Sequence, residues 1–214
     1  MNSKLRILLL AISVLFLMNC AVKQVKQSPN YEKSLSNFKR LTISISPDSK
    51  INPTEATLAK SIAEQELAHH KEFIVYPDPL NKNVNCGVQI GKSQGVLKLK
   101  LEESLNGSTP GFLVWLLPAV LGPSSNGMRL TISASMQKCD TKEILWEGKA
   151  ASSYPLGGDE EATLRTSYEN KLGKSIGPKV LPYYDLLKSL LDQIESPVLN
   201  EAEQDEKIEV EAGG

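Results

Sequence analysis

Histidine is almost absent from this sequence, whose 214 residues include only His69 and His70. Adjacent residues point to different faces of a helix and lack the i, i+4 spacing of a zinc site, so we expect no metal site here. The nucleophile elbow, the zinc-protease helix, the P-loop and the dinucleotide-binding glycine pattern are missing as well. We therefore expect no catalytic residues, no cofactor and no enzyme activity.

A strong charge of either sign is also lacking. The formal net charge is −1, to which Lys4 and Arg6 contribute +2, so the chain from residue 20 onward carries −3. A nucleic-acid partner would require a basic face. We therefore expect no nucleic acid among the partners.

Long apolar runs are scarce, and the first one has the layout of an export signal. Lys4 and Arg6 precede Ile7 to Met18, twelve residues in which Ser13 is the only polar one. Twelve residues of helix span roughly 18 Å, well short of the ~30 Å hydrocarbon core of a bilayer. A signal peptide over residues 1–19 is therefore a better interpretation than a transmembrane anchor.

The residues before Cys20 indicate how this signal is processed. The run Leu17-Met18-Asn19-Cys20 resembles a bacterial lipobox, in which the cysteine thiol receives a diacylglyceryl group. Leu17 fits the pattern, whereas Met18 and Asn19 depart from the usual small residues, as in the relaxed lipoboxes of spirochaete lipoproteins. The resemblance implies a palmitate-labelled lipid on Cys20 and a place in the cell envelope, at the outer membrane. The alternative is an uncleaved anchor that ends in an unmodified cysteine.

Two polar segments flank the body of the chain. Residues 20–40 mix Lys, Gln, Ser and Asn with few apolar residues, which predicts a flexible tether whose lysines could touch anionic headgroups. Residues 197–214 are strongly acidic, which is typical of a solvated disordered tail. Between them, residues 41–196 are enough for a single domain.

The two remaining cysteines are Cys86 and Cys139, 53 residues apart. An even number of thiols in a chain that leaves the reducing cytosol predicts a disulfide between them. Two buried free thiols, acting as small hydrophobic residues, are the alternative.

Hydrophobic periodicity predicts the fold class. A strand near 41–46, a helix that Asn52 caps with Glu55 as its capping-box partner, and a short strand at 73–76 form an α/β unit. Clean alternation then predicts three antiparallel strands with one wet face. These three segments are 96–104, 128–137 and 144–150, the last with Ile144, Trp146, Gly148 and Ala150 on one face.

The last part of the domain reads as helical. It runs from about 159 to 176, breaks at Gly177-Pro178 and Pro182, and resumes through Leu186 to Ile194. Together these elements predict an α+β domain with a mixed, largely antiparallel sheet of about five strands and helices packed on one face.

The hairpin over residues 127–154 also carries a resemblance. Its polar strand, its turn and its exit through Trp146-Glu147-Gly148 look like a pattern that recurs in small bacterial envelope lipoproteins. It departs from that pattern at Thr141-Lys142, where a glycine is usual. The resemblance implies an envelope lipoprotein and no particular activity.

One stretch is not required by this architecture, namely the insertion at residues 108–127. Phe112 to Leu121 is entirely apolar, is interrupted by Pro118 and is too short to span a bilayer. It could be a buried core element, a membrane contact or a protein contact. The candidate contact residues are Phe112, Leu113, Trp115, Leu116 and Leu117.

These features predict a lipid-anchored envelope protein that acts as a non-catalytic binding or assembly module. It would contact the membrane through its N-terminal lipid, and its apolar insertion would contact the membrane, an envelope protein or a second copy of the chain. A carrier of apolar ligands, with the insertion as a lid, and a small hydrolase with an unrecognised site are the alternatives.

Overall fold

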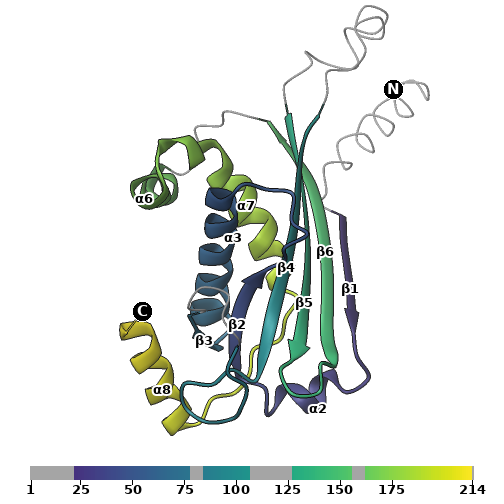
Figure 1. Cartoon of the computed structure of the whole chain (residues 1–214), viewed down its shortest axis with the longest axis vertical. Helices are drawn as coiled ribbons and strands as arrows, with labels where there is room; N and C mark the ends of the chain where they lie inside the picture. The colour runs from purple at the N-terminus through teal and green to yellow at the C-terminus, as the bar shows by residue number, and fades with distance from the viewer. Residues whose placement is uncertain (1–21, 78–83, 107–126, 156–161, 214) are drawn as a thin grey trace, which may run out of the picture.

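The computed structural model describes residues 22–77, 84–106, 127–155 and 162–213. Figure 1 shows one mixed sheet flanked by helices, and the strand order is β1-β6-β5-β4-β2-β3, so the predicted α+β class is confirmed. The strands are β1 Val22–Gln27, β2 Arg40–Ile45, β3 Ile74–Tyr76, β4 Gly95–Asn106, β5 Gly127–Lys138 and β6 Ile144–Pro155. The helices are α2 Tyr31–Leu35, α3 Pro53–Gln65, α6 Ala162–Leu172, α7 Gly177–Leu191 and α8 Glu201–Ala212. In this part of the chain no helix has the length and apolar character needed to cross a membrane.

The β2-α3-β3 segment forms the predicted α/β unit. β2 pairs in parallel with β3 on one side and with β4 on the other. The predicted capping box starts α3: the Asn52 side chain accepts a hydrogen bond from the Glu55 amide, and the Glu55 carboxylate accepts one from the Asn52 amide, both at 2.9 Å. A π-helical turn, Glu66–His70, ends this helical segment.

Strands β4, β5 and β6 form a long antiparallel meander, and their alternation is as predicted over most of its length. Leu97, Leu99 and Leu101 of β4 are fully buried, whereas Lys98 and Lys100 between them are exposed. Alternation places every second side chain on the same face, so the sheet has one apolar and one polar face.

The predicted pattern is wrong at the start of β6. A β-bulge shifts the register between Met136 and Gln137, so that Trp146 pairs with Met136 while Ile144 pairs with Gln137. The extra residue moves Ile144 out to 44% exposure and buries Leu145 instead.

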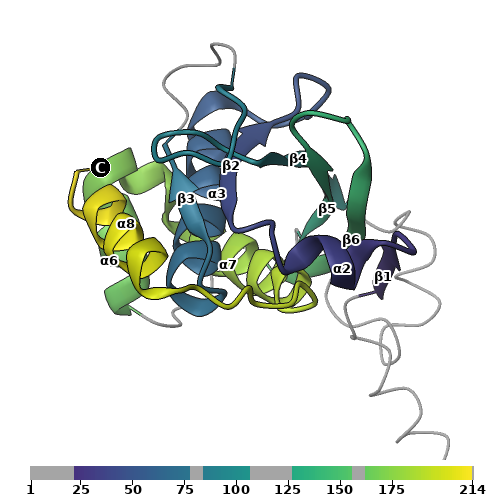
Figure 2. The ribbon, with the colours of Figure 1, turned by 90° about the horizontal axis from the view of Figure 1, so that it is seen from below.

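The apolar face of the sheet is covered by α3 and α7, around which the sheet curves in Figure 2. Trp146 is fully buried beneath α7. A Cβ added at Gly148 would lie 2.4 Å from the Trp146 ring and 2.8 Å from Leu190 of α7. Glycine at this position is therefore a packing requirement of the sheet–helix interface.

The segment expected to be a flexible tether is ordered from residue 22 onward. β1 adds to the edge of the sheet by pairing antiparallel with β6, which makes six strands rather than about five. α2 follows, and Tyr31, Leu35 and Phe38 are buried in the core at i, i+4 and i+7. The polar composition of this segment did not predict its order. β1 is stabilised mainly by backbone hydrogen bonds, and α2 and the residues after it contribute only three apolar side chains to the core.

The acidic end of the chain is also ordered, which corrects the expectation of a disordered tail over 197–214. A second capping box, between Asn200 and Glu203, starts α8. Its Glu206 is 3% exposed because it pairs with the rest of the domain.

The expected breaks at Gly177-Pro178 and Pro182 are not where the helices end. Gly177 and Pro178 instead begin α7, and Pro182 lies inside it. A proline in the first helical positions lacks only an amide that would have no intrahelical partner there.

Candidate functional site

The predicted lipidation and contact residues lie outside the described part of the chain. They are Cys20 and the insertion residues Phe112, Leu113, Trp115, Leu116 and Leu117. The residues from which these segments continue are described, however: Val22 follows Cys20 by two positions, and Asn106 and Gly127 flank the insertion. The geometry of the candidate site is therefore the geometry of these three attachment points.

All three attachment points lie toward the same end of the sheet, which we call the hairpin end and define by Asn106, Gly127 and Pro155. Asn106 pairs with Gly127, and Gly127 pairs with Pro155. Val22 pairs with Ala151, four positions before Pro155 on β6. At ~3.3 Å per residue, the start of β1 lies about 13 Å below the hairpin end. Figure 1 shows this arrangement at the upper end of β1, β4, β5 and β6.

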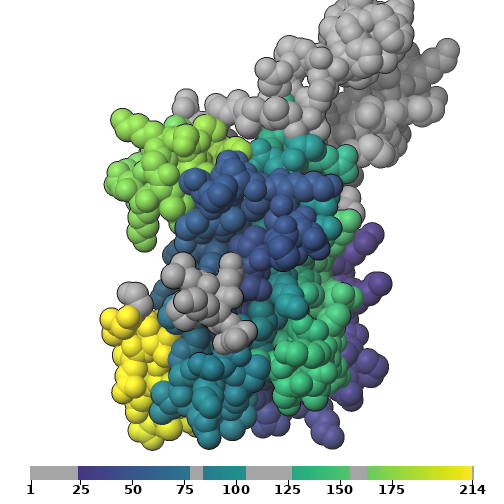
Figure 3. Space-filling model, in the orientation of Figure 1, coloured from purple at the N-terminus to yellow at the C-terminus, as the bar shows by residue number. Residues whose placement is uncertain are grey.

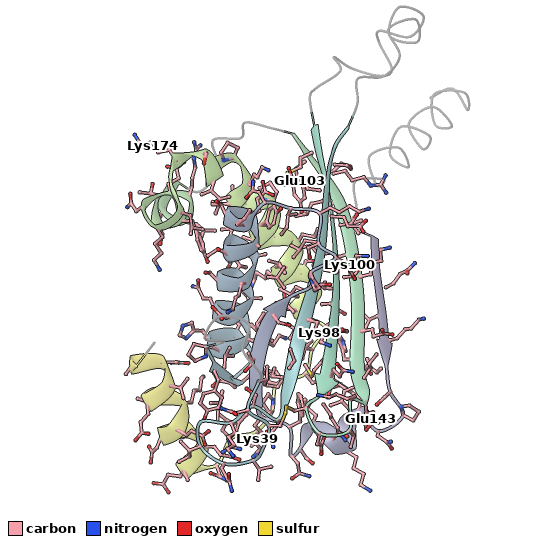
Figure 4. All side chains as sticks on the ribbon, viewed as in Figure 1. Lys39, Lys98, Lys100, Glu103, Glu143 and Lys174 are labelled. Carbon is pink, nitrogen blue, oxygen red and sulfur yellow. A yellow bond between two sulfur atoms is a disulfide. The ribbon has the colours of Figure 1, made fainter. Side chains whose placement is uncertain are left out.

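An ionic cluster braces the helices near this end. Lys179 of α7 lies 2.6 Å from Glu103 of β4 and also pairs with Glu55 of α3, and the Tyr183 hydroxyl donates to Glu103 at 3.1 Å. Burial opposes the charge on Lys179, but the two carboxylates outweigh it and raise its pKa. Burial and the same carboxylates raise the pKa of Tyr183 as well. Glu103, labelled in Figure 4, thus ties α7 to the strand that leads into the insertion, and Lys179 links α7 to α3.

The predicted disulfide is present at the opposite end of the sheet. It joins Cys86 and Cys139, whose Cα atoms are 5.5 Å apart. The Cys139 amide also donates to the Gln94 carbonyl at 2.8 Å. The bridge therefore fixes the segment before β4 to the turn between β5 and β6.

A second ionic cluster docks α8 onto the sheet. Arg40 of β2 makes two hydrogen bonds to the Glu206 carboxylate, which also accepts one from the Tyr76 hydroxyl. Lys39 pairs with Glu203 at 2.6 Å. Burial would raise the pKa of Glu206, but the hydrogen bonds from Arg40 and Tyr76 outweigh it and hold the pKa below its ordinary value of 4.5. Figure 3 shows α8, in yellow, covering one side of the lower part of the molecule.

The two histidines do not come together with other potential metal ligands. His69 Nδ1 lies 3.9 Å from a carboxylate oxygen of Glu211 in α8, and His70 Nε2 lies 3.8 Å from Glu66. Over residues 22–77, 84–106, 127–155 and 162–213, no group of three or more His, Cys, Asp or Glu side chains could hold a metal ion.

The polar face of the sheet also carries a candidate binding site, whose residues were not among those predicted from the sequence. An open groove of about 410 Å³ lies there, lined mainly by residues of β1, β4, β5 and β6. Lys98 and Lys100 of β4, both labelled in Figure 4, are among them. Alternation alone predicts that these lysines face solvent, but only the strand order shows which side chains of β1 and β6 lie beside them.

Comparisons with known proteins place this fold only broadly. No protein-family model matches the chain, and neither does any curated protein. The chain is similar to the PelC dodecamer from Paraburkholderia phytofirmans in space group P6, with a TM-score of 0.49 and 12% identity over 84% of this chain and 100% of that one. It is also similar to a protein from Caulobacter crescentus that is provisionally described as a lipoprotein, with a TM-score of 0.30 and 10% identity over 86% of this chain and 98% of that one. At this level of likeness neither indicates what this chain binds or does.

Proposed function

We propose that the protein is a lipid-anchored, non-catalytic module of the cell envelope whose hairpin end is held against the bilayer. The anchor is the lipid on Cys20, and the apolar insertion supplies a second contact. The observation that carries the proposal is the shared position of the three attachment points toward one end of the sheet.

The ordered β1 strand sets how far the domain can stand from its anchor. A flexible tether of twenty residues would let the domain adopt any orientation, but Val22 is already paired with Ala151. Only one residue separates Cys20 from this strand, so the anchor lies within about 7 Å of Val22. A lipid on Cys20 would therefore hold this end of the sheet at the membrane surface.

The insertion continues from the same end of the sheet. It leaves β4 at Asn106 and returns at Gly127, about 13 Å beyond the level of Val22. Apolar side chains there would enter the interfacial region, and the amphipathic ring of Trp115 suits that layer. A contact of this kind would add buried apolar area to the membrane affinity that the lipid supplies.

We propose a non-catalytic protein because few of the described side chains are placed to act as a general acid or base. Its two histidines face separate carboxylates, on α8 and in the π-helical turn. The buried carboxylates Glu55 and Glu206 already form ion pairs, and these ion pairs hold helices in place. These groups are accounted for by the stability of the fold.

Two sets of variants test the proposal. Cys20→Ala should abolish labelling with palmitate and release the protein from the membrane fraction. In that soluble form, replacing Phe112, Trp115 and Leu116 together by serine should weaken binding to vesicles and leave the melting temperature nearly unchanged. The matched control replaces Val88, Ile90 and Ile208, which are 69%, 69% and 64% exposed, by serine.

Four results would contradict the proposal. Palmitate labelling that persists in Cys20→Ala would show that the lipid is not attached to Cys20. A triple insertion variant that no longer folds would instead indicate a core element, since three such truncations cost several kcal/mol. Equal loss of vesicle binding in the control would show that the effect belongs to surface hydrophobicity in general. Loss of self-association without loss of vesicle binding would assign the insertion to contacts between copies.

A further inference from the structure

The polar face of the sheet gathers positive charge in a chain that is otherwise slightly acidic. The groove on this face is lined by four lysines and one glutamate, a net charge of +3, whereas the whole chain carries −1. The charged side chains are Lys26, Lys98, Lys100, Lys149 and Glu147. In the described part of the chain, no helix packs against this face.

The strand register places three of these lysines around a floor of serine hydroxyls. Ser133 of β5 pairs with Lys100 of β4 on one side and with Lys149 of β6 on the other. Ser135 pairs with Lys98 and Glu147 in the same way. Because strands are ~4.8 Å apart, the lysines flank a floor about 10 Å wide, and Lys98 and Lys100 follow each other at ~6.6 Å along β4.

These lysines keep much of their charge available. Lys98 donates to the neutral amide oxygen of Gln137 at 2.9 Å, and Lys100 lies 3.4 Å from the half-buried Glu102. Among the described residues, Lys26 and Lys149 form no ion pair within 4 Å, and Lys149 acts on Glu102 only at longer range than Lys100 and Lys50 do. The only acidic group in the lining is Glu147, which pairs in register with Lys26 of β1.

We infer that this groove binds a linear acidic polysaccharide, a chain of sugars that carries carboxylates at regular intervals. A single carboxylate would gain little, because an exposed ion pair in water adds almost no net binding energy. A polymer engages several lysines at once and releases the counterions condensed along it, so its binding is stronger and depends on salt.

The floor of the groove distinguishes a sugar chain from an acidic peptide. Peptides that bind to sheets gain most of their affinity from main-chain hydrogen bonds at a free edge. On the floor of this groove the backbone groups of β5 are already used by β4 and β6 on either side, and the free edge of the sheet lies at its border, on β1. What remains is a set of hydroxyls and ammonium groups, which complements the hydroxyls and carboxylates of a polyuronate. This inference depends on neither the lipid nor the insertion.

Binding of fluorescent polygalacturonate oligomers to the full-length protein in a neutral detergent tests the inference. The groove variant replaces Lys98, Lys100 and Lys149 by glutamine. The control variant replaces Lys33, Lys171 and Lys174, which are exposed and lie outside the groove, and so removes the same net charge. We expect the groove variant to bind about tenfold or more weakly, with a shallower salt dependence, and the control to change less than threefold.

Two comparisons complete the test. Neutral dextran should not bind, and poly-glutamate of equal charge should bind more weakly than polygalacturonate. Ser133→Asp, which adds a carboxylate to the floor without removing a lysine, should weaken binding as well and provides a second variant if the triple one fails to fold. Equal losses in the groove and control variants, or poly-glutamate binding as tightly as polygalacturonate, would overturn the inference.

Discussion

At the scale of single residues, some positions require a charged or a very small side chain because of the element that packs against them. Glu206 is an example, because a carboxylate on an acidic helix is buried only where Arg40 and Tyr76 satisfy it. Gly148 is another, since the Trp146 ring and Leu190 occupy the space where a Cβ would lie. Neither requirement follows from the local sequence, because Arg40 and Leu190 come from elements distant in the chain.

Gly148→Ala should destabilise the domain by roughly 1–3 kcal/mol, because the added methyl group would overpack the interface between β6 and α7. Urea unfolding measures this difference. Ser153→Ala, at an exposed position of the same strand, is the control and should stay within about 0.5 kcal/mol of the wild type. A Gly148→Ala protein as stable as the control would mean that Trp146 has room to move.

At the scale of elements, the sequence predicts the parts that have strong local signals. The alternation of β4 and β5 and the capping box of α3 were readable because they depend on residues close in the chain. β1 was not, because its order comes from hydrogen bonds to β6, which lies more than a hundred residues later. Two signals were available and unused: the i, i+4, i+7 spacing of Tyr31, Leu35 and Phe38, in and just after α2, and a second capping box at Asn200 and Glu203.

The candidate site was predictable to a similar extent. Parity alone paired Cys86 with Cys139, since only two cysteines remained. The insertion was recognised from its composition, but its position relative to Cys20 depends on the register of β1 against β6. The lysine groove depends in the same way on strand order, which periodicity does not contain.

The docking of α8 should depend on pH. The pKa values of Glu206 and Glu203 are lowered in the folded protein, so their ionised forms stabilise it at neutral pH. This contribution is present above their ordinary value of 4.5 and is lost as the pH falls through the lower folded values. Hydrogen exchange should therefore show α8 losing protection below about pH 4.5 before α7 does.

A variant links this behaviour to one carboxylate. Glu206→Gln removes the nearest charge from the buried Arg40, whose other carboxylate partner, Glu203, is 4.0 Å away, and breaking such a pair costs about 3 kcal/mol. Amide protection in α8 should then be low already at pH 7, whereas Glu209→Gln, at an exposed position of the same helix, should behave like the wild type. If α7 and α8 lose protection together in every case, α8 is not a separate ionic element.

The disulfide should stabilise the domain by reducing the number of conformations that the unfolded chain can adopt. Closing a separation of 53 residues corresponds to about 4 kcal/mol on the chain-entropy account. Reduction, or Cys86→Ser, should lower the free energy of unfolding by that order in urea titrations. An unchanged unfolding midpoint after reduction, verified by mass, would contradict this role.

At the scale of the whole molecule, the sheet separates three surfaces. The hairpin end carries the attachment points of Cys20 and the insertion, and the disulfide braces the opposite end. Between them, helices cover one face and the other presents the lysine groove. If the hairpin end meets the bilayer, the groove stands beside the membrane and open to the surrounding space. The proposed function therefore depends on the orientation of the domain, with the hairpin end against the bilayer.

Quenching by lipids that carry a nitroxide measures this orientation most directly. In the lipidated form that the proposal requires, an added cysteine would be the only free thiol, because Cys20 would be acylated and Cys86 is bridged to Cys139. A fluorophore at Arg129→Cys lies two residues from Gly127 at the hairpin end, and one at Glu32→Cys lies in α2, which follows the far end of β1. In reconstituted vesicles we expect strong quenching at position 129 and little at position 32. Equal quenching at both positions, or stronger quenching at position 32, would contradict the account.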